Sequence, residues 1–300
     1  AYDIIKQKTD LGLDLVPYPQ IFNDVNNQKA EVILYRPTGE SGDFEKANFP
    51  IGVEGGKTST CPTQNLMEAY DMKDGTPFVW NNQSNPYDNR DPRMKYTIVC
   101  NEMKWPVDPV EIWEGGTNGL PLQNATTTGY YLKKYVNNTI SFEAGSTVTK
   151  KQHNWVLFRY GEILLNYAEA MINAFHDPNY KDAVYNMSAR EAVNQIRGRT
   201  NISLPGFPSD ITEKDFVKRL KNERRVELAF EGHRFWDVRR WKELGQTANI
   251  YGVKITKNNE VISYEKFLLE TRAVTDNMYF YPIPNTERFK NPNLGQNPGW

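Results

Sequence analysis

The sequence predicts a mainly α-helical protein, in which a helical hairpin and C-terminal helices pack with a large loop-rich region that contains a few short strands. Three observations predict it. Apolar residues recur at helical spacing from residue 160 to residue 175. Capping signals at Ser188 and Thr212 begin two further helices. Between about residues 39 and 150, Gly, Pro, Asn and Thr are frequent and leave room only for short elements.

The first region is expected to span residues 1–150. Residues 1–9 have the pattern of the end of a helix. The β-branched and aromatic run at 30–37 predicts a strand. Thr63 can cap a short helix over residues 64–71, because its hydroxyl can accept hydrogen bonds from first-turn amides. Long irregular stretches in a compact chain are unusual unless they are functional, so a site is expected in this region.

The second region, residues 151–300, is expected to hold a helical pair and a C-terminal framework of helical and extended segments. In the first helix the apolar residues fall at i, i+3, i+4 and i+7, which is one stripe of an amphipathic helix. Ser188 and Glu191 form a capping box at the start of the second helix, and Gly198 is its expected end. The pair has the repeat length of about 34 residues that is typical of one tetratricopeptide (TPR) unit.

Thr212 and Asp215 predict a third helix that runs to about Phe230. Three acidic residues of this stretch share one helical face if the helix continues far enough. They are Glu223, Glu227 and Glu231, and the arginines close to them in sequence are Arg219, Arg224, Arg225, Arg234, Arg239 and Arg240. Paired carboxylates can act as a glycosidase pair. So many guanidinium groups would keep the carboxylates ionised, which favours a structural ion-pair lattice over a general acid.

The composition argues against several classes of function. Lys and Arg number 36 against 37 Asp and Glu, for a net charge of −1, so no broad positive field is present for nucleic acid or an anionic membrane. No apolar run approaches the roughly 20 residues of a membrane-spanning helix. Phosphate-binding and nucleophile motifs are absent from the sequence. We therefore expect no catalytic residue and no nucleic-acid partner.

Cys61 and Cys100 are the two cysteines, and neither belongs to a C-x-x-C pair. With three histidines, no cluster has zinc-site spacing, so we expect no metal site of that kind and no cofactor. The sequence leaves open whether the two cysteines form a disulfide or are two buried thiols. It also leaves open a structural calcium ion held by loop carbonyls and Asp side chains.

Aromatic residues make up 13% of a chain whose mean hydropathy is −0.69. Most of these rings are expected in the core, and exposed rings beside amide and carboxylate side chains suit sugars. The candidate ligand-binding residues are Trp80, Asn82, Tyr87, Trp105 and Trp113, which lie in residues 78–91 and 104–116. The alternative for each ring is an anchor of its loop in the core. Trp155, Trp236 and Trp241 lie in helical or framework motifs and are expected to be buried, and Trp300 is expected to be packed.

Motifs in order along nearly the whole chain match one known family. The most specific is residues 223–241 (ERRVELAFEGHRFWDVRRW). The others are residues 62–75 (PTQNLMEAYDMKDG), 89–98 (NRDPRMKYTI), 133–135 (KKY), 154–175 (NWVLFRYGEILLNYAEAMINAF), 192–200 (AVNQIRGRT), 281–284 (YPIP) and 296–300 (QNPGW). Together they resemble the carboxy-terminal portion of the SusD/RagB-like family.

The resemblance implies a cell-surface lipoprotein of the bacterial outer membrane that binds an oligosaccharide or, in some members, a peptide. It also implies delivery of that ligand to a SusC-like TonB-dependent transporter, by a lid-like movement over the barrel. The implied fold has four TPR units as a scaffold and an irregular face that carries the ligand site. The family's amino-terminal part, with its lipidated cysteine, has no counterpart in these 300 residues, so membrane attachment is expected only through an anchor upstream of them.

The function expected from residues and resemblance together is oligosaccharide or polysaccharide binding without catalysis, with specificity in the loops between about residues 39 and 150. Two alternatives remain open. One is a TPR-type module that binds a peptide or protein on a concave helix face. The other is a glycoside hydrolase, which needs two carboxylates roughly 5–10 Å apart across a groove.

Overall fold

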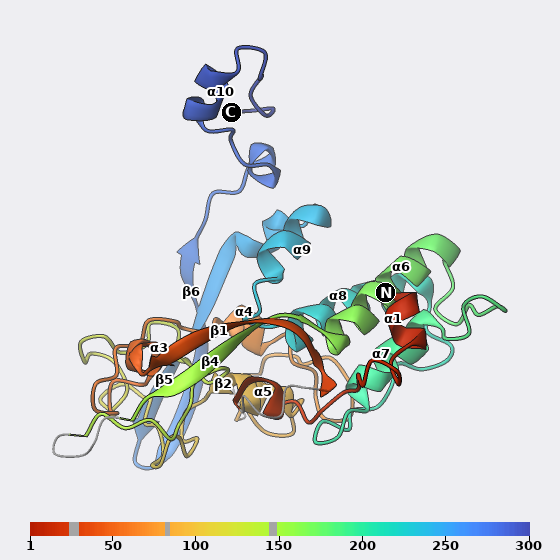
Figure 1. The fold of residues 1–300 in the computed structure, drawn as a ribbon. Helices are drawn as coiled ribbons and strands as arrows, with labels where there is room; N and C mark the ends of the chain where they lie inside the picture. The colour runs from red at the N-terminus through yellow and green to blue at the C-terminus, as the bar shows by residue number, and fades with distance from the viewer. Residues whose placement is uncertain (24–29, 82–84, 144–148) are drawn as a thin grey trace.

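Three helices form the helical side of the molecule: α6 (Tyr160–Phe175), α7 (Ala189–Arg197) and α8 (Glu213–Glu227). The short helix α1 (Tyr2–Lys6) packs against α6. The fold is taken from a computed structural model that describes residues 1–23, 30–81, 85–143 and 149–300. Figure 1 shows these helices gathered on one side and the loops and strands on the other. The bounds of α6 are those that the apolar stripe predicts.

The predicted helix starts are confirmed in atomic detail. The Ser188 hydroxyl accepts a hydrogen bond from the Glu191 amide at 3.1 Å, and the Glu191 carboxylate accepts one from the Ser188 amide at 2.8 Å. The Thr212 hydroxyl accepts from the Asp215 amide at 3.1 Å. Helix α8 ends at Glu227, slightly before the predicted residue 230, and α9 (Arg234–Arg240) follows after a turn.

Two strands far apart in the sequence form one antiparallel pair. They are β1 (Val32–Ser41) and β4 (Lys151–Arg159), and Arg36 lies opposite Trp155. Strand β1 confirms the strand expected at 30–37, although it runs further. Strand β4 leads directly into α6, so Arg159 ends the strand and occupies the N-cap position of the helix. The short helix α2 (Gln20–Asn23) contacts β4.

A long hairpin, β5 (Asn249–Asn258) and β6 (Val261–Thr271), crosses the far edge of the loop-rich region. Val253, Ile255 and Tyr264 are buried and join the core there. The sequence predicts this stretch only as extended framework and does not predict the hairpin.

The loop-rich region holds only short elements. They are α3 (Asp43–Asn48), α4 (Gln64–Met67), α5 (Arg93–Thr97), and the paired strands β2 (Ile98–Val99) and β3 (Tyr131–Leu132). The Thr63 cap of α4 is confirmed, because its hydroxyl accepts from the Leu66 amide at 3.3 Å, but the helix ends at Met67 and not at residue 71.

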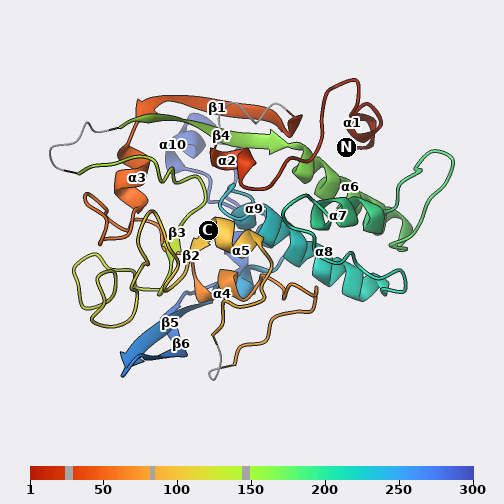
Figure 2. The ribbon, with the colours of Figure 1, turned by 90° about the horizontal axis from the view of Figure 1, so that it is seen from below.

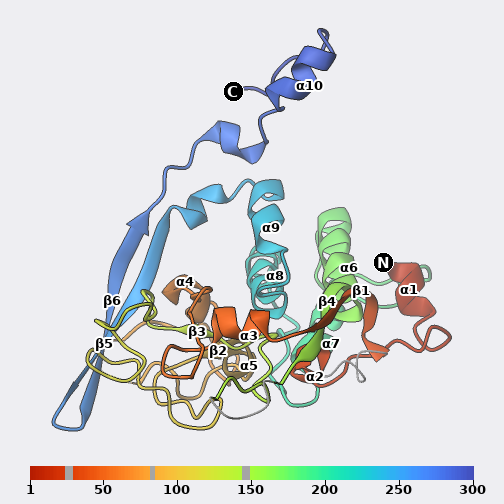
Figure 3. The same ribbon diagram turned by 60° about the vertical axis from the view of Figure 1, so that its left-hand side comes forward.

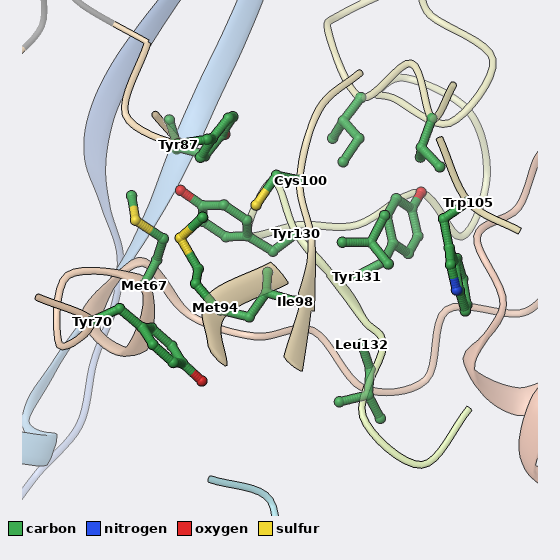
Figure 4. Packing of buried hydrophobic residues seen from close by; sticks show 14 of the residues in the cluster. Met67, Tyr70, Tyr87, Met94, Ile98, Cys100, Trp105, Tyr130, Tyr131 and Leu132 are labelled. Atoms are coloured by element: carbon green, nitrogen blue, oxygen red, sulfur yellow. The ribbon is translucent and has the colours of Figure 1, made fainter. Parts of the chain in front are cut away.

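Aromatic and sulfur-containing side chains fill the core beneath these loops. In Figure 4, Met67, Met94 and Cys100 lie around the Tyr130 ring, with Tyr87 above it. Large rings can fill the space between irregular segments where no regular sheet supplies aliphatic side chains. This packing explains why a hydrophilic chain is rich in aromatics.

The C-terminal segment, residues 272–300, projects beyond the loop-rich region and helices α6, α7 and α8 (Figures 1 and 3), and it contacts α9, where the Tyr281 ring stacks on Phe235 with 5.9 Å between centroids. It contains the 3₁₀ helix η3 (Asp276–Tyr279) and α10 (Asn285–Lys290). Trp300 is 49% exposed and Trp236, in α9, is 59% exposed, so the expectation that both are packed or buried is wrong. Trp155 and Trp241 are partly buried.

The predicted fold class is confirmed. Within the described residues the molecule is mainly helical, with strand pairs and a large loop-rich region. Figure 2 shows the loops on one side and α6, α7 and α8 on the other. The division of function between residues 1–150 and 151–300 stays a prediction.

Candidate functional site

Tyr87 and Trp105 do not present exposed rings. Tyr87 is 6% exposed and Trp105 is 3% exposed, and both belong to the core beneath the loops. The Tyr87 ring packs edge-on against Tyr264 at 5.3 Å between centroids, and Trp105 packs edge-on against Phe49 at 5.5 Å. The interpretation of these two rings as exposed platforms is therefore corrected: they anchor their loops in the core.

Trp80 and Trp113 are half-buried and pack against the same core. Trp80 lies edge-on to Phe78, with 6.4 Å between ring centroids. The Lys257 ammonium lies 4.6 Å from the centre of the Trp113 ring. Asn82 lies outside the described residues. The predicted site residues are therefore not brought together in one place, and their role in binding stays a prediction.

A hollow of about 760 Å³ lies among the loops, and we call it the loop hollow. Three stretches of irregular backbone line it, at residues 52–54, 105–111 and 138–143, together with Thr117 and Asn118. Of the predicted residues, Trp105 lines it, although little of that ring is exposed. The lining side chains with polar or aromatic groups are Glu54, Asp108, Glu111, Thr117, Asn118, Asn138, Thr139, Ser141, Phe142 and Glu143.

Asn118 fixes the wall of the loop hollow. Its side-chain oxygen accepts from the Gly52 amide at 2.8 Å, and its amide nitrogen donates to the Thr117 hydroxyl at 3.1 Å. The Tyr131 hydroxyl donates to the Asn118 carbonyl at 2.5 Å. A Cβ at Gly52 would lie 2.5 Å from the Asn118 side-chain oxygen, so a larger residue there would displace the Asn118 amide from this position. Loops tied to the core in this way can hold polar groups in fixed positions.

Phe142 supplies an aromatic surface in the lining of the loop hollow. Its ring packs edge-on against Phe49, with 6.1 Å between centroids, and it is only partly buried. A Cβ at Gly42 or Gly55 would lie 3.1 Å from Phe142, so both glycines allow the ring its place. Gly55 also has a φ of +81°, which favours glycine.

The charged side chains that line the loop hollow are all acidic. Glu54, Asp108, Glu111 and Glu143 line it, and no Lys, Arg or His is among the lining residues that the structure describes. The Thr117 hydroxyl donates to the Glu111 carboxylate at 3.2 Å. Carboxylate, amide and hydroxyl groups beside an aromatic ring can hydrogen-bond the hydroxyls of a neutral ligand and contact its apolar face.

A second feature is a buried ion-pair lattice that joins α8 to other segments. Arg93 of α5 contacts Glu223 at 2.6 Å and Glu227 at 2.9 Å. Arg159 contacts Glu227 at 2.8 Å and Glu231 at 2.7 Å. These side chains are at most 3% exposed. The other members are Glu31, Asp91, Lys134, Arg197 and Arg199.

The lattice confirms that the stacked carboxylates are ion-paired, but the predicted partners are wrong. The cations come from α5, β4, α7 and the residues that follow β3 and α7, and not from the arginines that follow or precede the glutamates in sequence. Arg224 instead pairs with Asp237 at 2.9 Å. Arg219 lies 3.5 Å from Asp71. These arginines point to other faces of α8 than the one that carries Glu223 and Glu227.

The lattice carboxylates are poor proton donors. Burial alone would raise the pKa of Glu227, but the guanidinium groups of Arg199 and Arg159 outweigh it and hold that pKa well below its usual value. The pKa of Glu223 is likewise lowered, because Arg93 and Arg197 outweigh the effect of burial. A general acid needs a proton near neutral pH, so these carboxylates do not fit the glycosidase alternative.

Other chemistry finds no support in the described part of the chain. His, Cys, Asp and Glu side chains do not gather there in threes that could hold a metal ion. Cys61 and Cys100 are separate thiols, and burial raises the pKa of Cys100 to about 12. Among the described helices, none has the length and apolar character needed to cross a membrane.

Sequence reasoning missed part of the loop hollow. Asp108 and Glu111 lie in the stretch 104–116 that was singled out, but Asn118, Asn138 and Phe142 lie beyond it. Their convergence depends on contacts such as that between Asn118 and Gly52, which are 66 residues apart. No local sequence signal reports such a contact.

Known proteins resemble this chain over its whole length. The model of the SusD family matches residues 21–300. SusD-like protein P2 of Formosa agariphila is 29% identical over 163 residues, which cover 52% of this chain and 28% of that protein. A solved SusD-like protein from Bacteroides fragilis NCTC 9343 is 26% identical with a TM-score of 0.80, and the match covers 100% of this chain and 62% of that one.

A SusD-like carbohydrate binding protein from the same organism has the same fold, with a TM-score of 0.78 at 24% identity, over 98% of this chain and 60% of that one. The chain therefore spans about three fifths of the length of these solved relatives, and a smaller share of the curated one. With a family match over residues 21–300 and a shared fold, the chain belongs to the SusD family.

Proposed function

We propose that the chain binds a glycan at the loop hollow, without chemical turnover, and delivers it to a SusC-like TonB-dependent transporter at the bacterial outer membrane. The observation that carries the binding step is the loop hollow itself, which is lined by Phe142 together with amide, hydroxyl and carboxylate side chains on irregular backbone. Its volume of about 760 Å³ lies within the usual range of small-ligand sites, roughly 300–1,000 Å³.

Membership of the SusD family supports this proposal, as does the solved relative that is described as a carbohydrate binding protein. The lack of turnover is supported by the lattice carboxylates, which are buried and held ionised by neighbouring guanidinium groups. Delivery and location rest on the family alone.

The binding step is tested by calorimetry of the chain with a panel of soluble oligosaccharides and polysaccharides, with product analysis of the same samples. We expect binding without breakdown. Phe142→Ala should weaken binding about fivefold to tenfold, because one aromatic contact contributes about 1 kcal/mol. Tyr35→Ala removes an exposed ring of β1 outside the hollow and is the matched control.

Breakdown products would overturn the claim of binding without turnover. Equal affinity of Phe142→Ala and the native chain would move the site away from the loop hollow. Delivery is tested separately by uptake of a labelled glycan into cells that express the complete gene in native or Phe142→Ala form. Uptake that does not depend on the gene would refute the delivery step.

A further inference from the structure

A second hollow, of about 440 Å³, lies between the residues that follow α4, residues 77–78, α8 and the 3₁₀ helix η2 (Leu244–Thr247), and we call it the basic pocket. It shares no lining residue with the loop hollow. Its positively charged lining side chains are Lys214, Lys218, Arg219, Lys221, Arg225 and Arg234. The proposed glycan site does not account for this concentration of positive charge.

Helix α8 places most of these cations in one stripe. Lys214, Lys218, Lys221 and Arg225 are spaced at i, i+4, i+7 and i+11, so they share one face of the helix. The opposite charges, including Glu223, lie on the buried face in the ion-pair lattice. Like charges at this spacing destabilise a helix, so the stripe carries a cost that a bound anion would relieve.

The acidic residues of the basic pocket do not neutralise it. Glu68 pairs with Lys266 at 2.8 Å, outside the pocket lining. Asp71 lies 3.5 Å from Arg219, and Glu243 lies 2.5 Å from Lys221. Four cations therefore lack a carboxylate partner within ion-pair distance among the described residues. They are Lys214, Lys218, Arg225 and Arg234.

The two guanidinium groups in this set are held by neutral acceptors. Arg225 donates to the Asn65 carbonyl at 2.8 Å, and Arg234 donates to the Gln246 side-chain oxygen at 2.7 Å. Burial, together with the nearby charge of Arg234, lowers the pKa of Arg225 to about 10. Partly buried guanidinium groups that repel each other, and keep N–H donors in fixed positions, match a planar or tetrahedral anion.

We propose that the basic pocket binds the carboxylate or sulfate group of a small ligand, which the unpaired guanidinium and ammonium groups neutralise. Pro77, Phe78 and Val217 form an apolar wall of the same pocket and would contact the body of that ligand. An acidic sugar, such as a uronic acid, offers both features. A free inorganic anion offers only the charge.

The test is calorimetry of the 300-residue chain with three probes at low salt: a galacturonic acid disaccharide, a neutral disaccharide and sodium sulfate. We expect the acidic disaccharide to bind and sulfate to compete with it. The neutral disaccharide should not change the affinity for either anion. Lys218→Gln combined with Arg234→Gln should weaken binding of the acidic disaccharide at least tenfold. Lys46→Gln, which removes an exposed charge from α3, is the control and should bind normally.

The thermal midpoint of each variant shows whether the fold is retained. If sulfate binds as tightly as the acidic disaccharide, the ligand of the basic pocket is a free anion. If the acidic disaccharide binds much more tightly than sulfate, the ligand is an acidic saccharide. The proposal is overturned if the double variant binds both anions as well as the native chain does, or if neither anion binds. Neutral glycan binding at the loop hollow is measured on the same variants and is expected to be unchanged.

Discussion

Arg159 is buried where β4 meets α6, and its guanidinium group donates to Glu31, Glu227 and Glu231. One side chain therefore joins the segment before β1, the end of α8 and the turn after it. Desolvation of so many charges makes such a lattice costly to assemble, and removal of one cation leaves carboxylates buried without compensation.

The first prediction concerns this residue. Arg159→Met keeps most of the side-chain volume but removes the charge, and it should lower the free energy of unfolding by about 3–5 kcal/mol. Arg36→Met, at an exposed position of the neighbouring strand β1, should change it by less than about 1 kcal/mol. Urea unfolding followed by circular dichroism measures both. Similar losses in the two variants would contradict a dominant role for the lattice.

The lattice also predicts how stability depends on pH. The pKa values of Glu223, Glu227 and Glu231 are lowered in the folded chain, because neighbouring cations outweigh the effect of burial. Below the unfolded pKa, about 4.3 for Glu, the unfolded chain therefore binds more protons than the folded chain. The stabilisation is present above that pH and is lost as the pH falls, by up to about 1.4 kcal/mol per pH unit for each carboxylate.

Urea unfolding between about pH 6 and about pH 3 tests this dependence. Glu223→Gln removes one of the titrating groups, so the free energy of unfolding should depend less steeply on pH, by the contribution of about one proton. This holds even if the variant is less stable at every pH. A free energy of unfolding that does not change between these pH values would contradict the assignment.

At the scale of the element, the β5–β6 hairpin turns through Asn259 and Glu260, with φ values of +47° and +66°. Two positive φ values in a two-residue turn favour Asn-Gly. Glu260→Gly should therefore stabilise the chain by about 0.5 kcal/mol, even though the exposed pair between Lys257 and Glu260 is lost.

Glu265→Gly makes the same substitution within β6 and is the matched control. It should destabilise the chain by about 1 kcal/mol, because glycine weakens a strand interior. Thermal unfolding of both variants gives the comparison. Equal effects of the two substitutions would contradict the expectation that the positive φ values of the turn reduce the stability of the chain.

The elements that sequence predicted well are those whose signals are local. The stripe of α6 and the caps at Ser188 and Thr212 depend on residues within one or two turns, and each is confirmed. Strand β4 was missed, because its pairing with β1 joins residues more than 100 positions apart. The family motifs indicated the fold, but their residues form the scaffold and do not predict which loops contact each other.

The candidate site shows the same limit. Aromatic content and loop composition predict a site between about residues 39 and 150. The loop hollow lies in that region and Trp105 lines it, while ligand binding there stays a prediction. Whether a ring such as Tyr87 is exposed depends on Tyr130 and Tyr264, which reach it from other segments. The packing of the whole core determines these neighbours. Sequence composition alone therefore could not distinguish rings that are buried in the core from rings that are exposed to a ligand.

At the scale of the whole molecule, two hollows of opposite charge lie on different parts of the surface. The charged side chains that line the loop hollow are carboxylates, while most of the charged side chains that line the basic pocket are cations. A net charge of −1 conceals this separation. Ligands of different charge should therefore respond differently to salt, since ionic strength screens attraction between charges and affects hydrogen bonding or apolar contact much less.

The last prediction follows from this separation. Raising sodium chloride from about 50 mM to about 500 mM shortens the screening length roughly threefold, so the affinity of an acidic disaccharide for the basic pocket should fall several-fold. The affinity of a neutral glycan for the loop hollow should change by less than about twofold, because no ligand charge is involved. Calorimetry of both ligands in one salt series gives the two slopes. Parallel slopes would mean that a single site binds both ligands, which would contradict the assignment of separate glycan and anion sites.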